Sequence, residues 1–381
     1  MTRAANNLSN TTITHDRHED MMQLTLRSRW MRLVMTAATV VGVATTAAAP
    51  AATAAGCATT VGVSPGASIY GYSDADLNQT FAQMRALGAT WTRIDIAWSS
   101  IEADRGVFTW GTTDRLVNAA RAQGLKVLGI VAYTPRWARA ASPVDSDKVV
   151  PANPADFGAF AARVASHYGN ALSAYEIWNE PNLQAFFMPR VDPGRYVQLL
   201  AAASTAIRSV NGGALIVGGG VTGAGNGGGN MNPVDFVRAM YGAGAAPFLN
   251  VVSVHPYSYP IDPSDTRPNP YNYFNAIPAV HATMVAGGDG AKPIWITEFG
   301  APTGSGSNAV SPAAQSAMIV HGVARARQFG YVGNVFVYSL RDAGPNVFDR
   351  EQNFGLRYSN GSPKPAYNDL RAYLARCGAP R

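Results

Sequence analysis

Two glutamates stand at the ends of short apolar runs, each close to a residue that bends the chain. Glu180 follows one run and precedes Pro181, and Glu298 follows another, two residues before Gly300. Because proline excludes the right-handed helical backbone from the residue before it, we expect Glu180 to stay extended at the rim of a strand. Two facing carboxyl groups can divide one reaction: one protonates a leaving oxygen while the other attacks the anomeric carbon of a sugar. The pair therefore predicts glycoside hydrolysis, provided that the fold brings it together.

Strand-like runs recur after residue 57, separated by longer helical stretches, which is the signature of repeated βα units. Several runs are apolar almost throughout, as in 127–131, 215–217 and 335–337, and such runs are typical of parallel strands covered on both faces. The runs begin near Thr59, Trp91, Lys126, Ser173, Ala214, Asn250, Lys292 and Gly333. This repetition predicts an α/β fold, a single (β/α)8 TIM barrel over residues 56–381, with Glu180 and Glu298 facing each other from strands four and seven.

The helical stretches carry start and stop signals that support this reading. Residues 74–87 end at Gly88, and the stretches 311–328 and 365–376 repeat the pattern. A doubly wound open sheet is the alternative fold. It would need a glycine-rich phosphate-binding turn after strand one, and residues 62–66 lack that spacing. The later glycines at 218–220 and 227–229 are interpreted as flexible loop.

The two glutamates lie in motifs that closely resemble the signatures of glycoside hydrolase clan A. These motifs are the tetrapeptide 178–181 (WNEP) and the pentapeptide 296–300 (ITEFG). The chain is most similar to the cellulase- and β-xylosidase-type members, families 5 and 39, over the whole predicted barrel. The resemblance implies that Glu180 is the acid/base, that Glu298 is the nucleophile and that Asn179 binds the sugar 2-hydroxyl. Glu180 must then keep a raised pKa in order to donate a proton.

Two further strand ends match the clan. Strand six ends with His255-Pro256-Tyr257, similar to the clan's His-x-Tyr, whose tyrosine hydrogen-bonds the nucleophile. Strand two carries Arg93, which resembles the clan's arginine beside the nucleophile and would hold that carboxylate ionised. Asp95, on the same strand, is interpreted as a structural partner of Arg93.

Two positions depart from the family pattern. Family-5-like members carry a histidine at the end of strand three, where this sequence has Tyr133, and often a tryptophan at the end of strand eight, where Tyr338 stands. Both positions shape the sugar subsite beside the cleaved bond, so the resemblance leaves the sugar open. Aromatic side chains can stack on sugar rings, and we expect Trp137 and Tyr338 to act as such platforms.

The first 55 residues are interpreted as a leader with a signal peptide. A basic segment, 27–32, precedes the apolar stretch 33–49, and the small residues at 51–56 offer a cleavage site. The apolar stretch is marginal for a membrane span, so an uncleaved anchor is the alternative. A true start at Met22 or Met31 would shorten the leader. We expect the mature chain to be secreted, with no other membrane association.

Export makes the two cysteines informative. Cys57 precedes the first predicted strand and Cys377 ends the last predicted helix. In an oxidising compartment such a pair would form a disulfide that ties the two ends of the fold together. The alternative is a lipid anchor at Cys57, because residues 54–57 form a loose lipobox-like sequence. That alternative would make no use of Cys377.

Composition narrows the remaining functions. The chain has 381 residues, of which 47% are hydrophobic and 14% charged, which is typical of a globular protein with a large core. The net charge of +6 comes from basic residues scattered singly, so no nucleic-acid surface is predicted. The six histidines do not pair at metal-ligand spacing, and we predict neither a metal nor a cofactor.

A carbohydrate is the predicted partner, and the sequence leaves the oligomeric state open. Two other functions remain for the same barrel. A transglycosylase would use the same residues and differ in accepting a sugar instead of water. A non-catalytic carbohydrate-binding barrel is the alternative from another class, but binding alone would not need a pair of glutamates.

Overall fold

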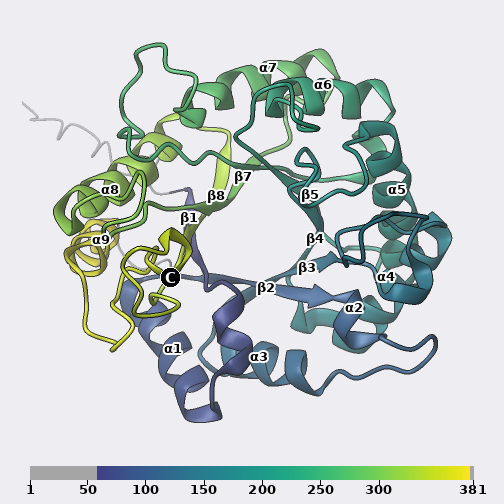
Figure 1. Cartoon of the computed structure of the whole chain (residues 1–381), viewed down its shortest axis with the longest axis horizontal. Coiled ribbons are helices and arrows are strands. Elements are labelled where there is room, and N and C mark those ends of the chain that lie inside the picture. Colours follow the sequence, from purple (N-terminus) through teal and green to yellow (C-terminus); the bar gives the residue numbers. More distant parts are fainter. Residues whose placement is uncertain (1–57, 378–381) are drawn as a thin grey trace, which may run out of the picture. The chain divides into compact units, whose positions relative to one another are not determined.

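The computed structural model describes residues 58–377, which fold into one closed barrel of eight parallel strands. Figure 1 looks down this barrel and shows the helices in a ring outside the strands. Neighbouring strands in the sequence are neighbours in the sheet, and the first strand pairs with the last to close it. The predicted single (β/α)8 barrel is confirmed. The strands are β1 (Thr60–Ser64), β2 (Trp91–Ala97), β3 (Lys126–Ala132), β4 (Ala174–Asn179), β5 (Ile216–Thr222), β6 (Val252–His255), β7 (Ile294–Phe299) and β8 (Val332–Tyr338).

Helices cover the outer face of the strands and begin where the sequence supplies caps. The side chains of Ser73, Asn153 and Ser311 each accept a hydrogen bond from a backbone N–H of the first turn, which satisfies a donor that the helix leaves unpaired. The helices are α1 (Asp74–Leu87), α2 (Trp98–Ile101), α3 (Gly111–Ala122), α4 (Pro154–Tyr168), α5 (Pro193–Val210), α6 (Pro233–Gly242), α7 (Ile277–Ala286), α8 (Pro312–Gln328) and α9 (Pro365–Ala375).

The predicted strands begin where the sequence placed them or within two residues of it, as at Ala214 against the observed Ile216. The interpretation of the glycines at 218–220 as flexible loop is wrong, because all of them lie buried in β5. Their smallness serves close packing instead. A Cβ atom on Gly220 would lie 2.2 Å from Nε2 of His255, so the neighbouring strand's imidazole occupies the space that a side chain would need.

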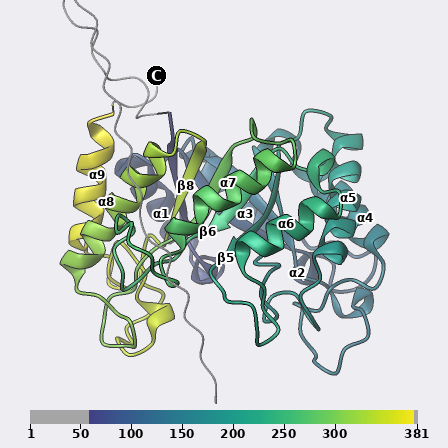
Figure 2. The same ribbon diagram turned by 90° about the horizontal axis from the view of Figure 1, so that it is seen from above.

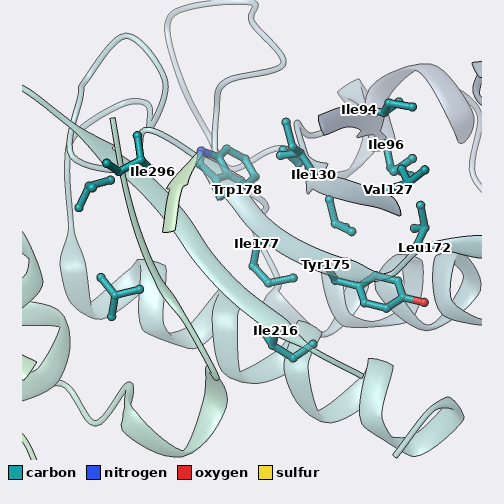
Figure 3. Close-up of a cluster of buried hydrophobic side chains, with 14 of the residues drawn as sticks. Ile94, Ile96, Val127, Ile130, Leu172, Tyr175, Ile177, Trp178, Ile216 and Ile296 are labelled. Carbon is teal, nitrogen blue, oxygen red and sulfur yellow. The ribbon is translucent and has the colours of Figure 1, made fainter. Parts of the chain in front are cut away.

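Apolar side chains form two separate clusters. The larger one lies between the strands and the helices and includes Ile94, Ile177 and Ile296, drawn with their neighbours in Figure 3. The smaller one is built from residues in the strands or next to them and includes Trp91 and Trp295, whose ring centroids lie 5.2 Å apart. Since β2 and β7 are not neighbours in the sheet, this contact crosses the inside of the barrel. The interior is therefore packed below the site and not an open channel.

The start of β1 and the end of α9 both lie at the upper edge of Figure 2, whereas long loops gather at the lower edge. The predicted signal peptide and Cys57 fall outside the described residues, so the leader and the disulfide with Cys377 stay predictions. Within residues 58–377, no helix is long and apolar enough to span a bilayer.

Candidate active site

A cavity of about 690 Å³ lies at the carboxyl ends of the strands. Loops that follow the strands form much of its wall, and the strand ends form its floor. Among the residues that the sequence singled out, the cavity is lined by Arg93, Asn179, Glu180, Tyr257, Glu298 and Tyr338. His255 is fully buried behind this wall. The site predicted from strand ends is thus assembled in one place.

The end of β4 departs from regular strand geometry. Trp178 has a positive φ of 72° and Glu180 one of 47°, so the prediction that Glu180 stays extended is wrong. The proline after it does exclude the right-handed helix, but the chain takes the left-handed region instead. The turn at Trp178 sends its indole outward against Phe157 and Phe187. As a result, two successive residues, Asn179 and Glu180, both face the cavity.

The end of β7 is irregular as well. Its register against β8 shifts between Ile296 and Phe299, which marks a bulge. In a regular strand, side chains alternate between the two faces, so Thr297 and Glu298 would point in opposite directions. A bulge re-aims side chains locally. Here Thr297 reaches buried partners in the barrel while Glu298 lines the cavity.

Glu298 is held as an anion by its neighbours. Arg93 donates from Nη1 to its Oε1, and the Tyr257 hydroxyl donates to Oε2 at 2.8 Å. Burial opposes ionisation of this carboxyl group, but the charge that His255 carries when both ring nitrogens are protonated, the charge of Arg93 and these hydrogen bonds outweigh it and lower the pKa of Glu298. The same side chain is 16% exposed, which leaves it accessible from the cavity. An ionised, reachable carboxylate is what nucleophilic attack requires.

Arg93 is fixed by three residues at once. Beyond Glu298, it donates from Nε to Glu176 at 2.6 Å and from Nη2 to Asn179 Oδ1 at 2.8 Å. Burial works against its charge, but the carboxylates of Glu176 and Glu298 raise the pKa of Arg93 above its ordinary value. Asp95, interpreted as a structural partner of Arg93, forms no hydrogen bond with it among the described residues and acts on the guanidinium only through its charge, which helps to raise the pKa of Arg93.

Glu176 is the residue that sequence reasoning missed. It is fully buried, and its Oε1 accepts hydrogen bonds from Gly220 N at 3.1 Å and from the Thr297 hydroxyl at 2.9 Å. A buried carboxylate needs such partners, since an isolated one would be far too costly. The signal was visible: Glu176 is a lone charge inside the apolar run of β4. A charge in such a run indicates a cation in the same interior, here Arg93.

His255 joins this buried cluster to Glu180. Its Nδ1 lies 2.9 Å from Oε1 of Glu180, and its Nε2 lies 3.0 Å from the Thr297 hydroxyl. Because that hydroxyl already donates its single hydrogen to Glu176, it can only accept from His255. Nε2 therefore carries a hydrogen. This leaves one proton to be shared between Nδ1 and the Glu180 carboxyl group.

Asn179 is oriented by the same logic. Its Oδ1 accepts from Arg93, which has only donors, so its amide nitrogen is the atom left for other partners. Asn179 is 7% exposed and lines the cavity. Its N–H groups can therefore donate to a hydroxyl of a bound molecule.

Glu180, His255 and Glu298 could hold a metal ion by distance alone, because one ligand atom of each lies within 4.8 Å of the others. Their hydrogen bonds argue against such a site. Of the four carboxylate oxygens, both of Glu298 and one of Glu180 already have partners in the protein. These three side chains are better suited to proton transfer and to nucleophilic attack at carbon than to metal binding.

The two predicted aromatic platforms lie in different places. Tyr338 lines the cavity. Trp137, in the short helix η3 (Arg136–Ala138), packs edge-on against Trp98 at 5.4 Å and donates to Glu102 O at 3.0 Å. It is not among the residues that line the cavity, so its position gives no support to a sugar-binding role. His255 likewise acts from behind Glu180 and does not itself line the cavity.

Comparisons with known proteins agree with this geometry. The family model of the cellulases, glycosyl hydrolase family 5, matches residues 53–333. No curated protein sequence matches the chain significantly. The fold resembles a family 39 glycoside hydrolase from the gut symbiont Bacteroides cellulosilyticus WH2, with a TM-score of 0.66 at 24% identity over 84% of this chain and 64% of that one.

Two other solved structures share the fold. A monomeric β-xylosidase from Caulobacter crescentus CB15 has a TM-score of 0.62 at 19% identity, over 82% of this chain and 66% of that one. A GH5_18 protein from Bifidobacterium longum subsp. longum, solved in complex with Manβ1-4GlcNAc, has a TM-score of 0.62 at 17% identity, over 84% of this chain and 78% of that one. The chain spans 64% and 66% of the length of the first two.

Proposed function

Because the chain belongs to the cellulase family, glycosyl hydrolase family 5, we propose that it is a retaining β-glycosidase that works through Glu180 and Glu298. One observation carries this proposal: an oxygen of each carboxyl group lies within 4.8 Å of the other, in a single cavity. Retaining enzymes hold their two carboxyl groups about 5–5.5 Å apart, whereas inverting enzymes leave roughly 6.5–9.5 Å for a water molecule. The spacing favours direct attack by a carboxylate.

In the first step, Glu298 attacks the anomeric carbon while Glu180 gives its proton to the departing oxygen. The bond to the leaving group breaks as the bond to Glu298 forms, and a β-glycoside becomes an α-linked glycosyl-enzyme. Arg93 and Tyr257 keep Glu298 ionised and aimed before attack, since both bond to its oxygens. The free N–H groups of Asn179 would hold the neighbouring sugar hydroxyl.

In the second step, water enters on the face that the leaving group vacated. Glu180, now a carboxylate, removes a proton from this water as the oxygen attacks the anomeric carbon, and Glu298 departs with its electron pair. Glu180 ends the cycle protonated, and the sugar leaves as the β-anomer. A transglycosylase would place a sugar hydroxyl where this water stands.

The contact with His255 lets Glu180 share the proton that it gives to the leaving oxygen. The Thr297 hydroxyl fixes the hydrogen of His255 on Nε2, so a neutral imidazole offers a lone pair at Nδ1. A carboxyl group 2.9 Å away can donate to that lone pair. His255 and Thr297 are positioning residues in this scheme, because they act through Glu180 and not on the substrate.

We also propose that the chain is exported. The basic segment, the apolar stretch and the small residues that precede Cys57 support a signal peptide, and an extracellular glycosidase would meet its carbohydrate outside the cell.

Proton NMR of the first product, recorded before mutarotation, tests the mechanism. The substrates are 4-nitrophenyl β-glycosides of glucose, mannose, galactose and xylose. We expect the β-anomer to form first from whichever glycoside is hydrolysed. An α-anomer that forms first would contradict the nucleophile role of Glu298. Sugar binding without turnover of any of these glycosides, or of polysaccharides, would favour the non-catalytic barrel.

A further inference from the structure

Two carboxylates that line the cavity take no part in the scheme above, and one of them, Glu351, pairs with Arg350 at 2.9 Å. Asp95 lines the cavity from β2, two residues along from Arg93, so both side chains point into the barrel. Its side-chain oxygens form no hydrogen bond or ion pair with any described residue. The hydroxyl of Tyr70 bonds to the backbone oxygen of Asp95 at 2.7 Å and leaves the carboxyl group unpaired. Asp95 is partly exposed to the cavity, so a bound molecule can reach these unpaired oxygens.

Charge neutralisation does not explain Asp95. The guanidinium of Arg93, on the same strand, is shared by Glu176 and Glu298, two carboxylates for one cation. Lys148 also lies on this side, but its ammonium pairs with Asp147 at 2.9 Å and stands over the Tyr133 ring. Asp95 thus adds negative charge to a cavity that already carries an excess. Burial accordingly raises the pKa of Asp95 from 3.8 to about 6.

A second polar group without a partner lies beside it. Tyr133 directly follows β3, which pairs with β2 through Asp95 and Ile130, and it lines the same cavity. Its hydroxyl forms no hydrogen bond with any described residue. Its φ of 67° is unusual for a side chain of this size. Glu180, Glu298 and Asp95 line the same cavity, so Tyr133 stands among the reacting groups.

We propose that Asp95 and Tyr133 bind hydroxyl groups of the sugar unit whose anomeric carbon meets Glu298, and so select a neutral sugar. A carboxylate accepts two hydrogen bonds and suits neighbouring hydroxyls, which donate to it. A phenol can donate or accept beside it. The same carboxylate repels an acidic sugar, because a uronic acid would set a second anion against Asp95, and the two arginines that line the cavity, Arg93 and Arg350, already pair with carboxylates. The inference rests on the proposed glycosidase function and names its substrate class.

Deoxy sugars test this assignment. The parent enzyme and the variants Asp95→Asn, Asp95→Ala and Tyr133→Phe are compared on the best 4-nitrophenyl β-glycoside and on its 3-, 4- and 6-deoxy analogues. We expect kcat/KM of the parent to fall at least about tenfold for one analogue, since a hydrogen bond to a charged group is lost. Asp95→Asn should lose a similar factor on the full sugar and should discriminate less against that analogue. The 2-deoxy analogue is the control, because its missing hydroxyl is assigned to Asn179.

Two results would overturn the inference. One is an equal loss for Asp95→Asn on every analogue, which indicates a structural role. The other is a parent enzyme that hydrolyses the matching 4-nitrophenyl β-uronide as well as the neutral glycoside. A parent that hydrolyses no glycoside contradicts the proposed function instead. In that case calorimetric binding of the methyl β-glycosides still decides: Asp95→Asn must weaken the affinity of a sugar that the parent binds, or the inference fails.

Discussion

At the scale of single residues, the two glutamates differ in their surroundings, so replacing each should affect catalysis in a different way. Arg93 and Tyr257 bind both oxygens of Glu298, whereas Glu180 contacts His255 through one oxygen. Glu298 is therefore suited to attack and Glu180 to proton transfer. Environment assigns the two roles, as it does wherever paired carboxyl groups divide a reaction.

Glu298→Ala should abolish turnover of every substrate, because no nucleophile remains. Glu180→Ala should spare the first step for good leaving groups, which need little protonation, and azide should restore turnover by attacking the glycosyl-enzyme without a general base. The measurement is kcat/KM over a series of aryl glycosides, with and without azide. Equal losses across the series and no rescue by azide would contradict the acid/base role of Glu180.

Thr297 gives a prediction about pH. Thr297→Val keeps the shape of the side chain but removes the acceptor for His255 Nε2–H, so the imidazole can move its hydrogen to Nδ1. Glu180 then faces a donor and holds its own proton less well. We expect the alkaline limb of the kcat/KM profile to begin at lower pH, most clearly for poor leaving groups.

Thr297→Ser is the matched control, because it restores the hydroxyl and should restore the profile. A profile of unchanged shape in Thr297→Val, reduced equally at all pH values, would show that Thr297 only supports the fold.

Ionisation of Asp95 in the active site should lower the stability of the folded protein. The pKa of its carboxyl group rises from 3.8 to about 6 in the fold, with burial as the main cause. A carboxyl group with a raised folded pKa favours the folded state below pH 3.8 and loses that contribution as pH rises through 6. At neutral pH the ionised group should cost on the order of 3 kcal/mol.

Asp95→Asn should therefore raise the thermal midpoint at pH 8 and leave it nearly unchanged at pH 4, while activity falls. Thermal unfolding at the two pH values measures this difference. Asp104→Asn, at an exposed position, serves as the control. A midpoint that falls at pH 8 would show that Asp95 is paired in the folded protein.

At the scale of elements, β5 needs a residue without a side chain where it passes the imidazole of His255. Gly220 leaves room for His255, whose Nε2 would lie 2.2 Å from an added Cβ. Gly220→Ala should push the ring away from Glu180 and cost roughly 1–3 kcal/mol of stability. The rate on poor leaving groups should fall more than the rate on good ones.

Gly225→Ala, in the loop after β5, is the control for Gly220→Ala, because nothing lies within 4 Å of a Cβ atom added to Gly225. Denaturant unfolding and the aryl glycoside series measure the two effects. A Gly220→Ala variant that keeps full activity on poor leaving groups would show that the exact place of His255 does not matter.

The same elements show what the sequence could predict. Apolar runs located the strands closely, because parallel strands buried on both faces leave a strong pattern. Local patterns could not predict the turn at Trp178 or the bulge before Phe299, since both depend on packing between strands. The role of Glu176 and the unpaired state of Asp95 depend on which side chains reach Arg93, and that is settled only when the barrel closes.

At the scale of the whole molecule, the ends of the chain should be tied together. The start of β1 and the end of α9 lie at the same edge of the barrel, close in sequence to Cys57 and Cys377 (Figure 2). If they form a disulfide, the loop-entropy relation puts its contribution at up to roughly 6 kcal/mol. Reduction should then lower the thermal midpoint of the secreted protein.

Intact-mass analysis of the secreted protein should show cleavage before Cys57 and two hydrogens fewer than free thiols would give. The double variant Cys57→Ala/Cys377→Ala is the control, and reduction should not change its midpoint. A diacylglycerol-sized addition on Cys57 would favour the lipid anchor.

Because the barrel closes through its first and last strands, β1 cannot pair with β8 until β8 has been synthesised. Thr60 bonds to Asn334, 274 residues further along the chain. At about 5–20 residues per second, a ribosome needs roughly 15–55 s to deliver β8 after β1. Throughout that interval β1 is an unpaired edge of apolar sequence, open to other chains. The nascent protein thus spends most of its synthesis unable to complete its fold, which exposes it to aggregation. If the chain is exported as we propose, the same delay keeps it unfolded long enough to pass through an export channel.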